Sequence, residues 1–189
     1  PKAGETAHSQ LTAVAREVIE RIGDAQVSVP EGFEVHSKLM NLLRKRQSMS
    51  RQGGIDWGFG ELLAFGSLLM EGVPVHMTGE DVRRATFAQR HAVMHDQRNG
   101  SEWTPLDYLT PNQAKLSIVD SLLSEYGAMA FEYGYSVERS EGLNIWEGKF
   151  GDFDNGAPTV IAEYVSSAEP KWGQNSGLVL LLPHGLEGQ

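Results

Sequence analysis

Residues 115–136, KLSIVDSLLSEYGAMAFEYGYS, decide the fold of this chain. They open with a mostly apolar run at 116–119, which is typical of a buried strand. A polar corner follows, and apolar and small residues then recur at the spacing of a helix. This order places Ser124 and Glu125 in the first helical turn, at the carboxyl end of a strand. Ligands bind at that edge in open α/β sheets.

Glu125 allows two interpretations. An acid in the first turn of a helix complements the helix dipole, which is a purely structural role. Alternatively, Glu125 is a carboxylate held in an otherwise apolar pocket, where it exchanges a proton with a ligand. The remaining segments of the chain decide between these roles.

Four short apolar stretches predict strands, at residues 73–78, 116–119, 143–146 and 178–182. Segments with a helical period separate them, so we expect a three-layer α/β/α fold with a mostly parallel sheet. A polar segment rich in Gly, acids, Arg, His or Phe follows each strand. In a parallel sheet these segments meet at one edge, and their aromatic residues among charges indicate a flat, apolar ligand with polar edges.

The first part of the chain predicts a helical arm. Helices are expected at 11–22, where Gly23 stops the first one, and at 36–51. The basic cluster at 44–46 in the second helix is expected to be a solvated face. Because Gly53-Gly54 marks a boundary, we expect an arm or linker at 1–52 and a ligand-binding domain at 53–189.

Two further helices are predicted. The helix at 57–70, capped by Asp56, is apolar nearly all round, so we expect it to be buried. Glu61 is conspicuous inside it. The second helix is expected at 158–166, just before the last strand.

Composition narrows the function classes. The formal net charge is -9, which argues against a nucleic-acid partner because phosphate binding needs clustered cations. The chain has no cysteine, which excludes disulfides, thiolate metal sites and cysteine nucleophiles. No apolar run reaches the roughly 18 to 20 residues of a membrane span, and no signal peptide opens the sequence. We therefore expect a cytoplasmic protein without a membrane partner.

A metal site is not expected from the histidines. His91 and His95 are four residues apart, which would pair them on one face of a helix. Zinc sites normally need three or four protein ligands, and no third ligand stands at a convincing spacing.

Four segments together resemble the thiamine-diphosphate-dependent decarboxylating component of the 2-oxoglutarate dehydrogenase complex. They are GEDVRRATFAQRHAV at 79–93, LSEYGAMAFEYGYS at 123–136, IWEGKFGDFDNGA at 145–157 and LLLPHGLEGQ at 180–189. The resemblance extends over about residues 30–189, and four linked motifs in the same order make it specific. It covers only the central pyrimidine-binding domain of that family, which is of the transketolase type.

The resemblance implies how the cofactor is held. In such enzymes thiamine diphosphate lies between two domains, usually from different subunits, and the other domain holds the diphosphate and magnesium. The family's glutamate, which corresponds to Glu125, bonds a pyrimidine ring nitrogen and drives the ring to its imino form. That form deprotonates the thiazolium carbon. The aromatic residue that packs on the ring corresponds to Phe150 or Phe153, of which we favour Phe153.

The resemblance also implies a set of neighbouring residues. Glu80 and Asp81 line the cofactor and substrate side of the crevice, and His184, from the last loop, is a catalytic candidate. Arg90 and His91 are candidates to meet the dicarboxylate substrate or a neighbouring chain, since arginine suits a carboxylate.

Two positions depart from the family. Lys149 stands where a glutamine is usual, beside the cofactor, where it would alter substrate preference or point outward. Ala85 stands where the family generally has glycine.

The function implied is the decarboxylation of 2-oxoglutarate and the transfer of a succinyl group to a lipoyl-bearing succinyltransferase component. The intact enzyme is expected to be a homodimer, with its magnesium ligands on the domain that this chain lacks, so the isolated chain is expected to be inactive. Two alternatives keep the fold: a non-catalytic dimerisation module, or the pyrimidine-binding half of another 2-oxoacid dehydrogenase. A generic nucleotide-binding domain is disfavoured, because no G-x-G-x-x-G or P-loop follows the first strand.

Overall fold

The computed structural model describes residues 12–149 and 156–183. Its helices are α1 (Arg16–Val27), α2 (Ser37–Gln52), α3 (Trp57–Met70), η1 (Pro105–Tyr108), α4 (Glu125–Glu138), α5 (Ala157–Val160), η4 (Ile161–Val165) and α6 (Ala168–Trp172). Its strands are β1 (Val75–Gly79), β2 (Met94–His95), β3 (Glu102–Trp103), β4 (Leu116–Asp120), β5 (Leu143–Glu147) and β6 (Leu178–Leu181).

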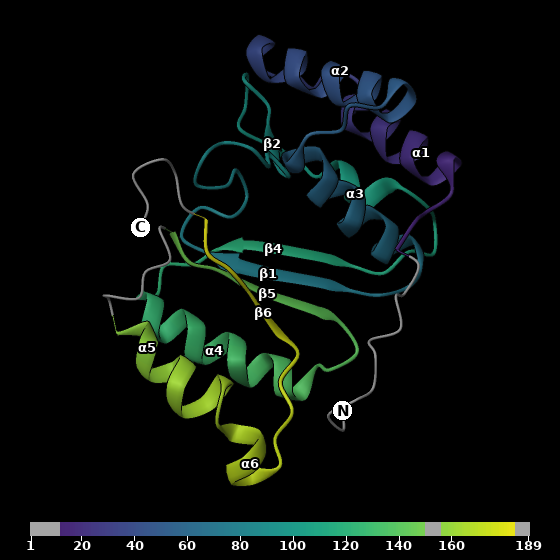
Figure 1. Cartoon of the computed structure of the whole chain (residues 1–189). Coiled ribbons are helices and arrows are strands. Elements are labelled where there is room, and N and C mark those ends of the chain that lie inside the picture. Colours follow the sequence, from purple (N-terminus) through teal and green to yellow (C-terminus); the bar gives the residue numbers. More distant parts are fainter. Residues whose placement is uncertain (1–11, 150–155, 184–189) are drawn as a thin grey trace.

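The four predicted strands form one parallel sheet in the order β4-β1-β5-β6. Helices α4, α5 and α6 cover one face of it, and α3 and α1 lie on the other (Figure 1). The predicted three-layer α/β/α architecture is therefore confirmed. The short strands β2 and β3 form a separate antiparallel pair between β1 and β4 in the chain.

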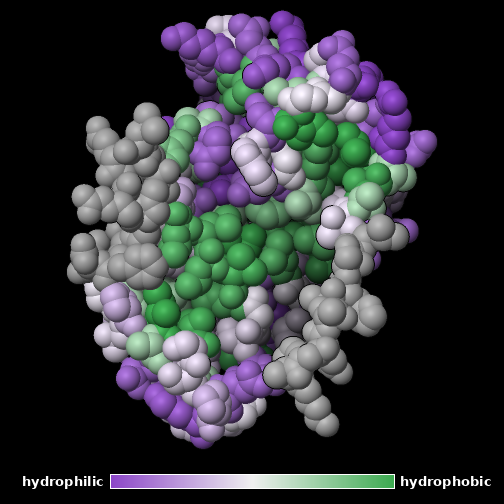
Figure 2. Space-filling view, in the orientation of Figure 1, coloured by the Kyte–Doolittle hydropathy of each residue, from purple (hydrophilic) through white to green (hydrophobic). Residues whose placement is uncertain are grey.

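Each face of the sheet has its own apolar core. The larger core joins α3, the sheet and the arm, since Ile22 and Met49 belong to the same cluster as Phe59 and Met77. The smaller core lies under α4 and α5 and is built around Met129 and Trp146. Figure 2 shows apolar surface across the middle of the molecule, at the level where Figure 1 places the sheet and its edge strand β6.

Helix α3 forms where it was predicted. The side chain of Asp56 caps it by accepting a hydrogen bond from the Phe59 backbone N–H at 2.9 Å. Half of its residues are buried, but Trp57 at its start is 95% exposed, so one side of the helix is open.

The prediction that Gly23 ends the first helix was wrong. Helix α1 begins at Arg16 and continues through Gly23 to Val27. A Cβ atom at position 23 would lie 2.3 Å from the Ser50 hydroxyl oxygen on α2. Gly23 is therefore needed for the close approach of two helices, and not as a stop signal.

The prediction that the basic cluster at 44–46 of α2 is solvated is only partly correct. Arg44 and Lys45 are exposed, but Arg46 is fully buried. Its guanidinium donates to the Gln89 and Arg90 carbonyl oxygens at 2.6 and 2.8 Å. Burial lowers the pKa of Arg46 to about 10, which still leaves it charged at neutral pH. This cation joins the arm to the loop after β1.

The helix predicted at 158–166 corresponds to two consecutive helical pieces, α5 and η4, which together span residues 157–165. Helix α5 passes into the π-helical turn η4, and α6 follows after a short break. The side-chain hydroxyls of Ser166 and Ser167 both donate hydrogen bonds to the Ala162 carbonyl oxygen. They replace backbone N–H donors at this point.

No helix in the described parts of the chain is both long and apolar enough to cross a membrane.

Candidate active site

The carboxyl ends of three strands meet at one edge of the sheet. Gly79 at the end of β1 lies beside Asp120 of β4 and Glu147 of β5. A Cβ atom at position 79 would lie 2.4 Å from the Glu147 carbonyl oxygen, so only glycine fits between these strand ends. The segments that begin at the ends of these three strands therefore start side by side, as predicted; residues 150–155 after β5 and 184–189 after β6 lie outside the described residues.

A small hollow of about 30 Å³ opens at this edge. Its lining residues come from the ends of β1 and β5 and from the start of α4, and they are Gly79, Glu80, Ser121, Leu123, Glu125, Ala128, Trp146 and Glu147. Glu80 and Glu125, which were selected from the sequence 45 positions apart, therefore share one hollow.

Glu125 is the first residue of α4, and Ser124 caps that helix by accepting a hydrogen bond from the Gly127 backbone N–H at 3.3 Å. The corner between β4 and α4 is held against β1, because the Ser121 backbone N–H donates a hydrogen bond to the Gly79 carbonyl oxygen. This bond helps to set the position of Glu125. The side chain of Glu125 is half-buried.

The other two acids of the hollow have cationic partners. Lys149 lies 3.4 Å from Glu80, and Arg90 lies 2.6 Å from Glu147. Within the described residues, the carboxylate of Glu125 has no ion pair or hydrogen bond. It is therefore the acid of this hollow that is available to a ligand.

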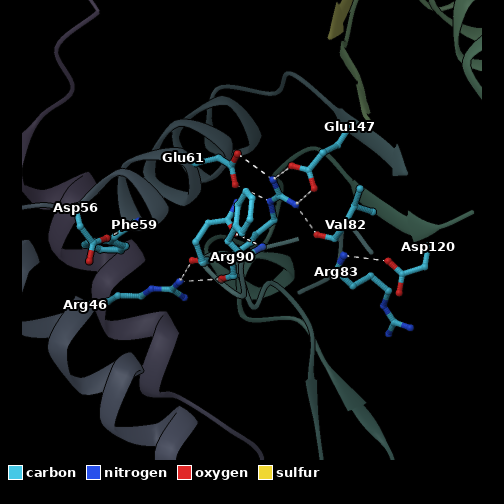
Figure 3. A network of polar contacts seen from close by, with 11 residues as sticks. Arg46, Asp56, Phe59, Glu61, Val82, Arg83, Arg90, Asp120 and Glu147 are labelled. Atoms are coloured by element: carbon cyan, nitrogen blue, oxygen red, sulfur yellow. Dashed lines mark hydrogen bonds and ion pairs between the residues drawn. The ribbon is translucent and has the colours of Figure 1, made fainter. Parts of the chain in front are cut away.

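Arg90 lies at the centre of a buried polar network (Figure 3). Its guanidinium is 0% exposed and bonds Glu61 through Nε and Nη2, at 2.5 and 3.1 Å. It bonds Glu147 through Nη1 and Nη2, at 3.2 and 2.6 Å, and the Val82 carbonyl oxygen at 2.7 Å. These contacts occupy all five of its N–H donors.

The network corrects the substrate role expected for Arg90. A guanidinium with no free donor and no exposed surface is not available to a substrate carboxylate in this arrangement. Burial alone would lower the pKa of Arg90, but the hydrogen bonds and charges of Glu61 and Glu147 outweigh burial and raise it. Arg90 is a permanent cation that joins α3, the loop after β1 and the end of β5.

The loop after β1 is strained. Ala85, Ala88 and His91 have φ angles of 76°, 54° and 46°, which residues other than glycine rarely adopt. Its backbone is held in place by bonds from the Arg90 and His91 N–H groups to the Arg84 carbonyl oxygen, both at 3.1 Å. Strain of this kind persists where the surroundings determine the conformation, and it is frequent at functional sites.

His91 lies at a second hollow, of about 280 Å³. Polar side chains from the N-cap of α2, from the loop after β1 and from β2 line it, among them His36, Asp81, Arg83, Arg84, His91 and His95. Burial lowers the pKa of His91, and the charges of Arg46 and Arg84 lower it further. Asp81 is paired with Arg84. Glu80 and Asp81, although adjacent in sequence, thus line different hollows.

Three candidates lie outside the described residues. They are Phe150, Phe153 and His184, so their predicted contacts with a cofactor stay predictions. Lys149, the last described residue before this gap, is half-buried and faces the hollow through its pair with Glu80.

The histidines do not form the helical pair considered from their spacing. Residues 91–95 include no helix, and His95 is exposed on β2. No group of three His, Cys, Asp or Glu side chains within 12–149 and 156–183 is arranged to hold a metal ion.

Sequence reasoning missed the pairing of Glu61 and Glu147 through Arg90. The signal was present, because an acid inside an apolar helix and an acid ending an apolar strand both need a buried cation. Arg90 was instead assigned by its resemblance to a substrate-binding position.

The fold and the site now define a class of protein. The family description "Transketolase, pyrimidine binding domain" matches residues 53–189, so the chain belongs to this family. Membership implies binding of thiamine diphosphate, and the resemblance predicted from the sequence is confirmed.

The similar curated proteins belong to a narrower class of enzyme than the domain family does. The chain is 50% identical over 184 residues to the multifunctional 2-oxoglutarate metabolism enzymes of Mycobacterium sp. (strain JLS) and Mycolicibacterium vanbaalenii. The alignment covers 94% of this chain and 15% of each of these relatives. The chain therefore spans about a seventh of the length of the curated relatives it matches.

Proposed function

We propose that this chain is the pyrimidine-binding half of the active site of a thiamine-diphosphate-dependent enzyme that decarboxylates 2-oxoglutarate. One observation carries the proposal: among the described residues, Glu125 is the carboxylate without an ion pair in a hollow at the carboxyl edge of the sheet, whereas the other two acids of the hollow are paired with cations. Family membership and the 2-oxoglutarate relatives support the cofactor and the substrate class.

The residues of the hollow fit an aminopyrimidine ring. Ala128 and Trp146 supply apolar wall, and Glu125 supplies an acceptor for a ring N–H or a shared proton. The hollow alone is too small for the ring, which agrees with a site completed by a second domain. The predicted ring contact of Phe150 or Phe153 remains part of this proposal.

Thiamine diphosphate, when bound, supplies a thiazolium carbon that attacks the 2-oxoacid and holds the electrons released on loss of carbon dioxide. Glu125 holds the proton at a pyrimidine ring nitrogen, so that the exocyclic amine can act as a base. Proton transfer of this kind is efficient only where water is excluded, because water would solvate the carboxylate and compete for the proton.

The neighbouring residues have supporting roles in the proposal. Lys149 neutralises Glu80, and Asp81 orients Arg84 at the edge of the second hollow. In this proposal His91 and Arg84, which line the second hollow, meet a substrate carboxylate or a neighbouring chain. His184 remains a catalytic candidate by resemblance.

The proposed reaction passes a succinyl group to the lipoyl-bearing succinyltransferase component of a complex. In this proposal the enzyme is a cytoplasmic homodimer, and the magnesium ligands lie on the diphosphate-binding domain. The location of Glu125 in a hollow, and not on a convex surface, disfavours a purely dimerising module.

The test is Glu125→Gln in a full-length enzyme that carries this chain. The substitution keeps the shape of the side chain but removes the proton-accepting charge, so 2-oxoglutarate decarboxylation should fall by at least about 100-fold, in the range typical of a lost acid–base group. Glu138→Gln, at the exposed end of the same helix, is the matched control and should leave activity unchanged. Wild-type turnover in Glu125→Gln would refute the assignment.

A further inference from the structure

Arg90 connects the two sides of the candidate site. Of its two carboxylate partners, Glu147 lines the hollow that contains Glu125, whereas Glu61 lies on α3 and lines a different depression beside Trp57. Both acids bond the guanidinium through two N–H groups each. The Arg90–Glu61 and Arg90–Glu147 pairs are thus similar as structural contacts, but only Glu147 lines the hollow that contains Glu125.

The charge balance of the hollow depends on this arrangement. The acids around Glu125 are Glu80 and Glu147, and the cations that pair with them are Lys149 and Arg90. Glu147 is almost completely buried, so its charge cannot be screened by water. If Arg90 were neutral, the buried carboxylate of Glu147, a residue that lines the same hollow as Glu125, would lose the charge of its cation.

We propose that Arg90 is a positioning residue for cofactor binding, which acts through Glu147. By holding and neutralising the Glu147 carboxylate, it leaves Glu125 as the single free acid that a pyrimidine ring meets at this edge. It also fixes the strained loop after β1 against the end of β5, because the same guanidinium binds the Val82 carbonyl oxygen. This inference rests on the proposed function, in which Glu125 is the partner of the ring.

The experiment compares four variants of a full-length enzyme that carries this chain: Glu61→Gln, Glu147→Gln, Arg90→Met and the double variant Arg90→Met with Glu147→Gln. The affinity for thiamine diphosphate with magnesium is measured by calorimetry between about pH 6 and 8.5. The thermal unfolding midpoint of each variant is measured alongside.

Glu61→Gln and Glu147→Gln should lower the unfolding midpoint by similar amounts, because each loses one carboxylate of the same cation. Only Glu147→Gln should change the affinity for the cofactor, because Glu147 lines the hollow that contains Glu125 and Glu61 does not.

Arg90→Met should weaken cofactor binding at least about tenfold, because it leaves the buried charge of Glu147 unpaired. Removing that charge in the double variant should restore the affinity to within about threefold of wild type. A structural role alone predicts no such recovery.

Equal effects of Glu61→Gln and Glu147→Gln on cofactor binding would overturn the proposal, and this comparison holds even if Arg90→Met does not fold. Unchanged binding in a folded Arg90→Met would overturn it too. Glu125→Gln in the same titration separates this inference from the proposed function. If Glu125→Gln binds and turns over as wild type, the proposed function fails; if it behaves as proposed and the two glutamine variants do not differ, only the role of Arg90 fails.

Discussion

At the scale of single residues, the environment of each charge decides its role. Glu125 was selected from a local pattern, the acid that follows a strand and opens a helix, and the structure places it in the hollow that this pattern predicts. Arg90 shows the limit of the same reasoning. Its burial depends on Glu61 and Glu147, which are 29 and 57 residues away along the chain, and no local pattern reports such contacts.

A pH-dependent contribution to stability belongs to His91. Its pKa is lowered in the folded state by burial and by the charges of Arg46 and Arg84, whereas the unfolded chain has an ordinary pKa of about 6.5. Below about pH 6.5 the unfolded chain therefore binds more protons at this position than the folded chain. The contribution of His91 to the free energy of unfolding is therefore expected to fall as the pH drops from about 7 to 5.

We expect His91→Gln to reduce this acid sensitivity, by less than about 1 kcal/mol because solvent screens a half-exposed ring. The measurement is urea denaturation at pH 7 and pH 5. The exposed His95→Gln is the control and should keep the wild-type pH dependence. An acid sensitivity in His91→Gln as large as that of wild type would contradict the account.

At the scale of elements, the strands and the apolar helices could be predicted from the sequence, because hydrophobic periodicity is a local signal. Helix α3 and the parallel pairing of the four strands agree with that prediction. The end of α1 and the broken helix after residue 156 could not be predicted in the same way. A glycine at a helix crossing and a glycine at a helix end look alike in the sequence, and only the partner helix distinguishes them.

Two glycines of α3 provide a test of this distinction. A Cβ atom at Gly58 would lie 2.5 Å from the Gln89 carbonyl oxygen, which also accepts a hydrogen bond from Arg46. Gly58→Ala should therefore displace the loop after β1 and cost about 1–3 kcal/mol. At Gly60 a Cβ atom has space, so Gly60→Ala should stabilise the helix by up to about 1 kcal/mol. Chemical denaturation measures both, and equal effects of the two substitutions would contradict the packing described for α3.

At the scale of the whole molecule, the candidate site is a shallow edge and not a closed pocket. The hollow around Glu125 is small, and the acids and cations that surround it are already balanced except at Glu125 itself. The arm contributes to the same core as the sheet through Ile22 and Met49. Within the described residues, this hollow therefore has one carboxylate without a cationic partner, that of Glu125.

The central claim is that this edge of the sheet is the pyrimidine-binding half of a thiamine diphosphate site. The most direct measurement is a calorimetric titration of thiamine diphosphate with magnesium into this chain, alone and together with the diphosphate-binding half of the enzyme, with circular dichroism to verify folding. We expect no measurable binding to the folded chain alone, and we expect binding to be recovered with the second half and weakened by Glu125→Gln. Tight binding to the chain alone, or recovered binding that is indifferent to Glu125→Gln, would contradict it.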